Sequence, residues 1–535
     1  MIRRAGVHAR LIAVVVLCQP ACHRAPVQLR PDATVGAASP AAPASPARPA
    51  PPATPARPAS PAIASLRSDI DAILDAPALG HSYWGVLVKS LKSGDTLYER
   101  NARRLMMPAS NMKIVTLAAA ADRLGWDYTY ETQLFAAGPI ADGILRGDLV
   151  AVGSGDPSMM ATGADTLFAG WADALKHAGV QMIAGRVIGD DNRFEDNGLG
   201  FGWSWDDLPD DYAAGVGALQ FNENMVRISI APGPAAGDSA GITVSPPGSG
   251  LSCVCAVTTS AAGAPTAIRV RRLPGSMRLE LGGTIALASS PAALSVSVEN
   301  PTLFFATALR DALIARGIDV RGAAVDIDDV SDPPARGTTP IAAHRSPPLS
   351  TLALRLMKDS QNLYAETFLK TLSIRAGDPV ATAERGRAEA AAALEAWGVS
   401  GADLIQRDGS GLSRYDYVTA DALVTILTHI DRDERLRGPF VTSLPIAGRD
   451  GSLTNRMKGT AAEGNARAKT GSMSNVRTLS GYVTSASGEP LVFSILANNF
   501  EVPPDTINRT TDAIIVRLAT LARQMSRGHE SRGTT

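Results

Sequence analysis

The sequence predicts an α/β fold in which helices pack on one antiparallel sheet and a long, mostly β insertion divides the chain. Strand-like runs occur both near the start and near the end of the folded part, so the two ends can share one sheet. Between them, residues 133–339 change to short strand-like segments separated by Gly-Asp and Gly-Pro turns. We therefore expect a discontinuous main domain at 66–132 and 340–525, with one or two small domains inserted at 133–339.

The first 22 residues are typical of an export signal. Basic residues precede a short apolar run from Leu11 to Cys18, and the small residue Ala21 follows. The run is too short to cross a bilayer, which takes about 20 apolar residues. We expect an exported protein of the periplasm or cell envelope, and a disordered cationic tail is the alternative. Lipid attachment at Cys22 stays open, although the Gln-Pro pair before Ala21 fits it poorly.

Residues 23–65 consist almost wholly of Ala, Pro, Ser and Arg. Such a composition buries too little apolar surface to fold, and its prolines favour extended geometry. We expect a disordered, semi-rigid linker that holds the folded part away from a membrane or wall. Residues 526–535 are expected to be a disordered tail.

The first elements of the main domain are a hairpin and a helix. Apolar and aromatic runs at 83–88 and 96–99 flank a turn-like Lys-Ser-Gly-Asp segment. A helix is expected over 108–124, because proline opens it and glycine follows its end. It is apolar nearly all round after its first turn, which predicts that it is buried. The insertion is expected to contribute strands at 148–153, 186–189 and 225–230.

Helical pattern returns at 350–373 and 382–397. Three more strands are predicted at 468–470, 479–484 and 491–496. A final helix at 505–525 closes the fold, and it would pack with helix 108–124 on the shared sheet.

Composition excludes some classes of function. The 51 basic and 52 acidic residues give a net charge of −1, so there is no basic footprint for a nucleic acid. Cys253 and Cys255 are two residues apart on an expected strand, which makes an awkward disulfide, and no further metal ligands lie nearby. We expect them to be packing residues. The seven histidines lack metal-ligand spacing, and we predict no cofactor and no metal.

Ser110 and Lys113 are the strongest candidates for chemistry. They are three residues apart on an expected helix, so their side chains share a face. A serine hydroxyl needs a base to become a good nucleophile. Lysine has a reference pKa of about 10.4, so it can be that base only if its pKa is lowered. Burial and a second nearby cation both lower the pKa of a lysine.

Two further motifs would complete such a pocket. Lys469 begins a Lys-Thr-Gly strand, where it would supply the second cation and attract a substrate carboxylate. Ser360 and Asn362 head a helix, where the serine can relay a proton and the amide can hold Lys113. Among the lysines we compared, only Lys113 has a serine three residues before it. A second Lys-Ser-Gly, at 92–94, falls in the expected hairpin turn and is a decoy.

Other serines are weaker candidates. Ser410 and Ser413 lie in an Asp-Gly-Ser-Gly-Leu-Ser segment and lack the required lysine. The density of Gly and Asp there predicts a turn.

The three motifs resemble those of penicillin-binding proteins and serine β-lactamases, which carry S-x-x-K, S-x-N and K-T-G in this order. The long interval between Ser110 and Ser360 is similar to that of the class C low-molecular-mass penicillin-binding proteins, the D-alanyl-D-alanine carboxypeptidase/endopeptidase family. The stretches that carry the resemblance are PASNMK at 108–113, GDLVAVGSGDPS at 147–158, VIGDDNRF at 187–194, DGSGLSRYD at 408–416 and ARAKTGSMSNVRTLSGYV at 466–483.

The resemblance implies a penicillin-binding/β-lactamase-like transpeptidase domain and an acyl-enzyme on Ser110. The substrates would be peptidoglycan stem peptides or cross-links ending at D-alanine, and β-lactams would be covalent inhibitors. The N–H groups of Ser110 and Ser472 would form the oxyanion hole. Lys469 and Thr470, at the start of the K-T-G, would bind the terminal carboxylate.

The resemblance also implies a subsite for an amine of the stem peptide. Asp190 matches the acidic residue of that subsite, and Asp191 stays open as an alternative. Met473 would line the same subsite, beside Gly471 and Ser472. The rivals are a β-lactamase or esterase on the same fold and a non-catalytic cell-wall-binding protein. The sequence leaves open the oligomeric state and the balance between carboxypeptidase and endopeptidase.

Overall fold

In the computed structural model, residues 60–523 are described, and one antiparallel sheet joins the two ends of this region. Its strand order is β2-β1-β22-β21-β20, so the first strand of the described region pairs with the last along its whole length. The strands are β1 (Tyr83–Ser90), β2 (Thr96–Arg100), β20 (Arg467–Met473), β21 (Val476–Thr484) and β22 (Pro490–Asn498). The predicted sharing of one sheet by both ends is confirmed.

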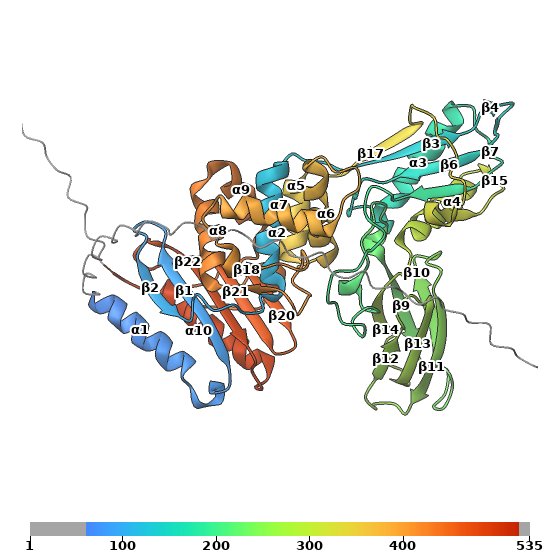
Figure 1. The fold of residues 1–535 in the computed structure, drawn as a ribbon. Coiled ribbons are helices and arrows are strands. Elements are labelled where there is room, and N and C mark those ends of the chain that lie inside the picture. Colours follow the sequence, from blue (N-terminus) through green and yellow to red (C-terminus); the bar gives the residue numbers. More distant parts are fainter. Residues whose placement is uncertain (1–59, 524–535) are drawn as a thin grey trace, which may run out of the picture. The chain divides into compact units, whose positions relative to one another are not determined.

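Helices cover both faces of this sheet (Figure 1). Alternate side chains of β1 point to opposite faces. Val86 and Val88 pack with α1 (Pro61–Leu74) and α10 (Pro504–Ala519), whereas Leu87 packs with the helices of the other face. Those helices are α2 (Met112–Leu124), α5 (Leu349–Lys358), α6 (Asn362–Arg375), α7 (Ala383–Glu395), α8 (Ala420–Arg432) and α9 (Glu434–Ser443).

The central helix α2 is buried on every side from Met112 to Ala121, as its alanine-rich sequence predicted. A short 3-10 turn, η2 (Ala109–Asn111), precedes it, so the regular helix begins later than expected. This turn rests against β20 and β21 of the sheet. The arrangement brings the start of the helix to the edge of the sheet.

The segment between α2 and α5 forms further sheets. A five-stranded sheet has the order β16-β8-β6-β3-β17. Its strands begin at Glu131 and end at Arg345, so the insertion extends slightly beyond the expected range of 133–339. A four-stranded sheet and two three-stranded sheets accompany it. The strands of these sheets are β3 (Glu131–Ala137), β4 (Ile140–Ala141), β5 (Ile144–Leu145), β6 (Asp148–Val152), β7 (Met182–Ile183), β8 (Val187–Asp190), β9 (Met225–Ala231), β10 (Gly241–Ser245), β11 (Ser252–Ser260), β12 (Ala267–Arg271), β13 (Arg278–Ala286), β14 (Ala292–Ser297), β15 (Asp319–Val320), β16 (Ala324–Asp326) and β17 (Ala342–Arg345).

Two long helices in this segment were not predicted. They are α3 (Ala161–His177) and α4 (Pro301–Ala315), whose aromatic residues pack together with the strands in one core. Cys253 and Cys255 are half-buried against the same core and are not bonded to each other, in line with a packing role.

Three expected boundaries were wrong. Helix α1 begins at Pro61, because Ile63, Leu66, Ile70 and Leu74 give it an apolar stripe, so the expected linker cannot extend to residue 65. The last helix ends at Ala519, where Thr520 caps it, and not at 525. The expected helix 350–373 is two helices, α5 and α6, with a break at Ser360.

The expected signal, Cys22 and the tail lie outside the described residues. Within 60–523, none of the helices has the length and apolar character to span a bilayer.

Candidate active site

Ser110 lies in turn η2, directly before α2, and its hydroxyl faces Lys113. The Lys113 Nζ donates a hydrogen bond to Ser110 Oγ at 3.0 Å. The turn is anchored to the sheet, since Thr478 Oγ1 donates to the carbonyl of Pro108 at 2.8 Å. Ala109 adopts a φ of 45°, in the left-handed region. The sequence separation of three residues therefore places the two groups together, as predicted.

The ammonium group of Lys113 is fully enclosed. Its side chain is 0% exposed, and its Nζ also donates to Asn362 Oδ1 at 2.6 Å and to the carbonyl of Ser410 at 2.9 Å. Burial lowers the pKa of Lys113 from its usual 10.5 to about 8. A pKa near 8 leaves a useful fraction of neutral amine at neutral pH, so Lys113 can accept a proton from Ser110.

Three carboxylates oppose this shift, and the sequence reasoning missed them. The charges of Asp408, Glu366 and Asp416 raise the pKa of Lys113 against the effect of burial. Asp408 also accepts hydrogen bonds from the N–H groups of Ser410, Gly411 and Ser413. Glu366 accepts from Gly409 and Ser410.

The Asp-Gly-Ser-Gly-Leu-Ser segment at 408–413 forms the turn that its Gly and Asp content predicted. It presents the Ser410 carbonyl to Lys113. The signal for Glu366 was available, because it lies four residues after Asn362 on α6 and therefore on the same face.

Lys469 lies on β20 and is also fully buried. Its Nζ donates to Ser360 Oγ at 2.8 Å and to the carbonyl of Thr470 at 2.9 Å. Burial, with a further contribution from the charge of Lys113, holds the pKa of Lys469 well below its usual value.

The expectation that Lys469 lowers the pKa of Lys113 is corrected by this arrangement. Burial is the largest cause of the lowered pKa of Lys113, and the charge repulsion between the two amines adds to the effect of burial on Lys469.

Ser360 and Asn362 reach the pocket through the break between α5 and α6. Ser360 has a φ of 62°, which ends α5 and turns its hydroxyl toward Lys469. Asn362 begins α6 and bridges the site, since its Nδ2 donates to the carbonyl of Tyr212 at 2.7 Å. The two residues therefore contact Lys469 and Lys113 respectively.

Gly471 lets strand β20 lie against the nucleophile. A Cβ at this position would meet Thr478 Oγ1 at 2.1 Å, the carbonyl oxygen of Pro108 at 2.7 Å and the Ser110 nitrogen at 3.0 Å. No side chain fits there, so the K-T-G glycine is required by close packing. The expected oxyanion donors, the N–H groups of Ser110 and Ser472, therefore lie on two segments in direct contact.

A cavity of about 750 Å³ opens in front of Ser110. Residues from the predicted motifs and from several neighbouring segments line it. They are Ser110, Gly202, Ser204, Asp207, Tyr212, Ser360, Asn362, Gly411, Leu412, Arg414, Ser452, Thr470, Ser472, Met473, Ser474, Asn475, Arg477 and Pro504. Thr470 and Met473 thus both line the cavity, and Thr470 Oγ1 donates to Ser452 Oγ at 2.6 Å. Asp207 is the acidic residue of this cavity.

Asp190, the residue expected to contact a substrate amine, is not among those lining the cavity, and this expectation is corrected. Its carboxylate pairs with Arg336 Nη1 at 2.7 Å. Asp207 lines the cavity instead, and it lies in a Trp-Asp-Asp segment that carried no motif signal. Tyr212 donates to Asp207 Oδ1 at 2.9 Å.

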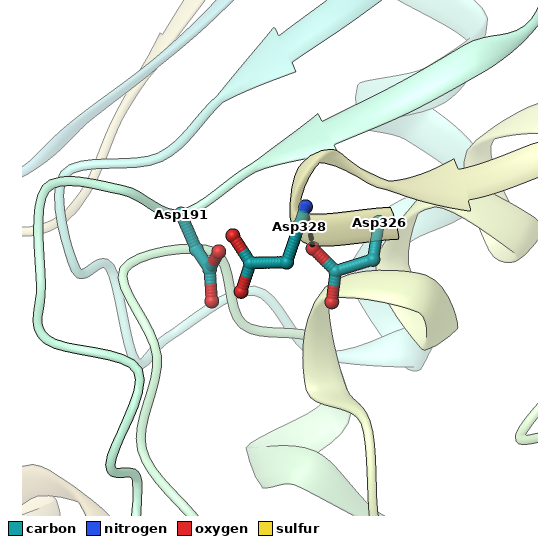
Figure 2. A group of neighbouring side chains, drawn as sticks. All are labelled: Asp191, Asp326 and Asp328. Carbon is teal, nitrogen blue, oxygen red and sulfur yellow. Dashed lines mark hydrogen bonds between the residues drawn. The ribbon is translucent and has the colours of Figure 1, made fainter. Parts of the chain in front are cut away.

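Asp191 also points elsewhere, toward Asp326 and Asp328 (Figure 2). One oxygen from each of these three carboxylates lies within 4.8 Å of the other two, which is close enough for one cation. Asp191 accepts a hydrogen bond from Thr302 and Asp326 accepts one from Asn300, so protein groups already hold both. Burial raises the pKa of Asp191 to about 6.

Comparison with known proteins agrees with this geometry. Residues 66–521 match the D-Ala-D-Ala carboxypeptidase 3 (S13) family. The chain belongs to this family. It is 34% identical over 483 residues to a D-alanyl-D-alanine carboxypeptidase of Actinomadura sp. (strain R39), covering 88% of this chain and 86% of the relative.

Other S13 relatives extend the likeness to structure. The chain is 26% identical to the D-alanyl-D-alanine carboxypeptidase DacB of Haemophilus influenzae, over 81% of this chain and 88% of the relative. The crystal structure of penicillin-binding protein 4 (DacB) from the same organism superposes with a TM-score of 0.74, at 26% identity, over 84% of this chain and 99% of that one. The predicted resemblance to class C penicillin-binding proteins is confirmed, and so is the α/β fold. This S13 member is a serine peptidase.

Proposed function

We propose that this S13 enzyme is a D-alanyl-D-alanine carboxypeptidase that works through an acyl-enzyme on Ser110. The neutral amine of Lys113 takes the Ser110 proton as Oγ bonds to the carbonyl carbon between two D-alanines. The N–H groups of Ser110 and Ser472 stabilise the negative oxygen, and such donors are typically worth about 2.7–4 kcal/mol each. The C–N bond then breaks as Ser360 relays the proton held by Lys113 to the leaving nitrogen of D-alanine, which leaves both residues as they began. Water hydrolyses the ester and restores Ser110.

Substrate binding would divide between the two ends of the cavity. Lys469 and Thr470 would bind the terminal carboxylate, whose negative charge would favour the protonated form of Lys469. Asp207 would pair with an amine of the stem peptide, with Met473 beside it. The same cavity would accept a cross-linked stem, so endopeptidase activity on cross-links is part of the proposal. β-Lactams would acylate Ser110 covalently, as the bound β-lactam of a DacB structure supports.

Peptidoglycan lies outside the cytoplasm, so the enzyme would act in the periplasm or cell envelope after export. The basic start and short apolar run of the sequence support this.

One observation carries the proposal: a fully buried Lys113 Nζ lies 3.0 Å from Ser110 Oγ and has a pKa near 8. The test is labelling of the purified protein with a fluorescent penicillin, beside Ser110→Ala and a control, Ser93→Ala, from the decoy Lys-Ser-Gly. Stable labelling lost only in Ser110→Ala is expected. Rapid turnover of the label would favour a β-lactamase, and no labelling would favour a non-catalytic wall-binding protein. Mass spectrometry of digested muropeptides then identifies the bond cut.

A further inference from the structure

Exposed aromatic side chains are concentrated at the mouth of the cavity. Five aromatic residues are strongly exposed in residues 60–523, and four of them lie on two loops beside Ser110's cavity. Those four are Phe201, Trp205, Tyr212 and Tyr415. Exposed apolar groups that gather in one place mark binding surfaces, whereas single ones are ordinary.

Phe201 and Tyr415 form one surface, called here the aromatic rim. They come from different loops, yet their ring centroids are 5.8 Å apart with an angle of 57° between planes. Their exposed fractions are 61% and 55%, so most of each ring faces solvent. The guanidinium carbon of Arg407 lies 5.9 Å from the Phe201 centroid and adds hydrogen-bond donors to the rim.

The aromatic rim is continuous with the cavity. The Tyr415 ring covers Gly202, where an added Cβ would lie 2.3 Å from a ring carbon. Gly202 and Arg414, the direct neighbours of Phe201 and Tyr415, both line the cavity. A long substrate with its reacting end at Ser110 can therefore leave the cavity across these rings.

We propose that the aromatic rim binds the glycan part of peptidoglycan, the amino sugar to which the stem peptide is joined. This inference rests on the proposed function and adds a second substrate element to it. A sugar ring presents a face of C–H groups that stacks on an aromatic face, and its polar groups project around the edge. The N-acetyl carbonyl of an amino sugar can accept hydrogen bonds from Arg407.

The chemistry of the surroundings favours a sugar over more peptide. The groups suited to peptide lie inside the cavity, namely the edge of β20, the amide of Asn362 and the carboxylate of Asp207. The rim offers flat rings and a guanidinium, and rigid aromatic side chains lose little conformational entropy when they bind. The enzyme would then prefer stems still attached to glycan over free stem peptides.

The test compares two substrates that differ only in the sugar. One is a free peptide ending in D-Ala-D-Ala, and the other is the same peptide joined to its N-acetylglucosamine–N-acetylmuramic acid disaccharide. The variant Phe201→Ala/Tyr415→Ala is expected to lower kcat/KM for the disaccharide substrate about ten-fold through KM. Phe201→Trp, which keeps a ring, should retain the preference. Tyr83→Ala, an exposed aromatic elsewhere, is the control.

The outcomes separate this inference from the proposed function. Equal use of both substrates by the unsubstituted enzyme, or equal loss on both in the double variant, would overturn the glycan subsite. In the second case the rings would bind the stem peptide. Penicillin labelling of each variant reports Ser110 alone, so its absence in the unsubstituted protein would count against the proposed function instead.

Discussion

Gln361 donates a hydrogen bond through Nε2 to the buried carboxylate of Glu223 at 2.9 Å. Gln361 stands between Ser360 and Asn362, whereas Glu223 belongs to the inserted segment. Arg355 of α5 holds the same carboxylate with two further hydrogen bonds, at 2.7 and 2.8 Å. The inserted segment therefore braces the break between α5 and α6, on which the positions of both active-site side chains depend.

Glu223→Gln should weaken this brace. It removes the charge that pairs with Arg355, and hydrogen bonds to charged groups contribute about 1.5–3 kcal/mol. Because Arg355 is partly exposed, we expect a loss near the lower end of that range in the free energy of unfolding, measured with urea. Penicillin acylation should slow several-fold. Glu434→Gln, a change on the exposed start of α9, is the control. Unchanged acylation would show that Ser360 and Asn362 keep their places without Glu223.

The acylation rate should rise with pH. Lys113 acts as a base only when neutral, and its pKa of about 8 means that about one tenth is neutral at pH 7 and half at pH 8. We expect the second-order rate of penicillin acylation to increase about five-fold between these two pH values. Lys113→Arg should abolish acylation across the range, because arginine stays protonated. A flat profile from pH 6 to 9 would contradict the assignment of Lys113 as the base.

Gly471→Ala should separate the nucleophile from strand β20. The new methyl group would collide with Thr478 Oγ1 and with the backbone at Pro108 and Ser110. Overpacking of this kind typically costs about 1–3 kcal/mol of stability. Misplacing one oxyanion donor should lower acylation about 100-fold or more.

The matched control for Gly471→Ala is Gly282→Ala, on strand β13, where an added Cβ would meet nothing within 4 Å. Equal acylation by the two glycine variants would mean that close approach of β20 is not needed.

Asp191→Asn should stabilise the protein at neutral pH. Burial raises the pKa of Asp191 from 3.8 to about 6, so between pH 4 and 6 the native state binds more protons than the unfolded state. The free energy of unfolding therefore falls as pH rises through that window. By pH 7 the carboxylate is ionised and the full loss of stability is present. The shift corresponds to at most about 3 kcal/mol.

Thermal unfolding at pH 7 should show a higher Tm for Asp191→Asn than for the unsubstituted protein, with a smaller gain at pH 5. Asp332→Asn, at an exposed carboxylate, should change neither value. A lower Tm at pH 7 would show that the ionised carboxylate is needed where it stands, and the sign of our prediction would be wrong.

Much of the catalytic geometry was predictable because it depends on local spacing. Ser110 and Lys113 share a helix face, and the strand pattern around Lys469 fixed which side chains face inward. The break at Ser360 was not predictable, since it depends on a left-handed residue held by contacts distant in sequence. Asp207 was missed for a similar reason. It lies in a loop without regular pattern, and only tertiary packing brings that loop to the cavity.

The electrostatic prediction failed in an instructive way. The sequence led us to expect that burial and the charge of the second lysine together lower the pKa of Lys113. This expectation did not include the carboxylates of Asp408, Glu366 and Asp416, which lie near Lys113 on α6 and on the loop 406–416. The carboxylate charges raise the pKa of Lys113, but burial of the amine lowers it by more.

The pairing of β1 with β22 has a consequence for synthesis of the chain. Ser110 and Lys113, in η2 and α2, are synthesised early. Strand β20 completes their cavity and strand β22 pairs with β1, but both are synthesised near the end. Pairings so distant in sequence form late in folding. A nascent or truncated polypeptide lacking its last hundred residues would thus carry the nucleophile without a working centre, which delays any hydrolysis until the whole molecule has been made.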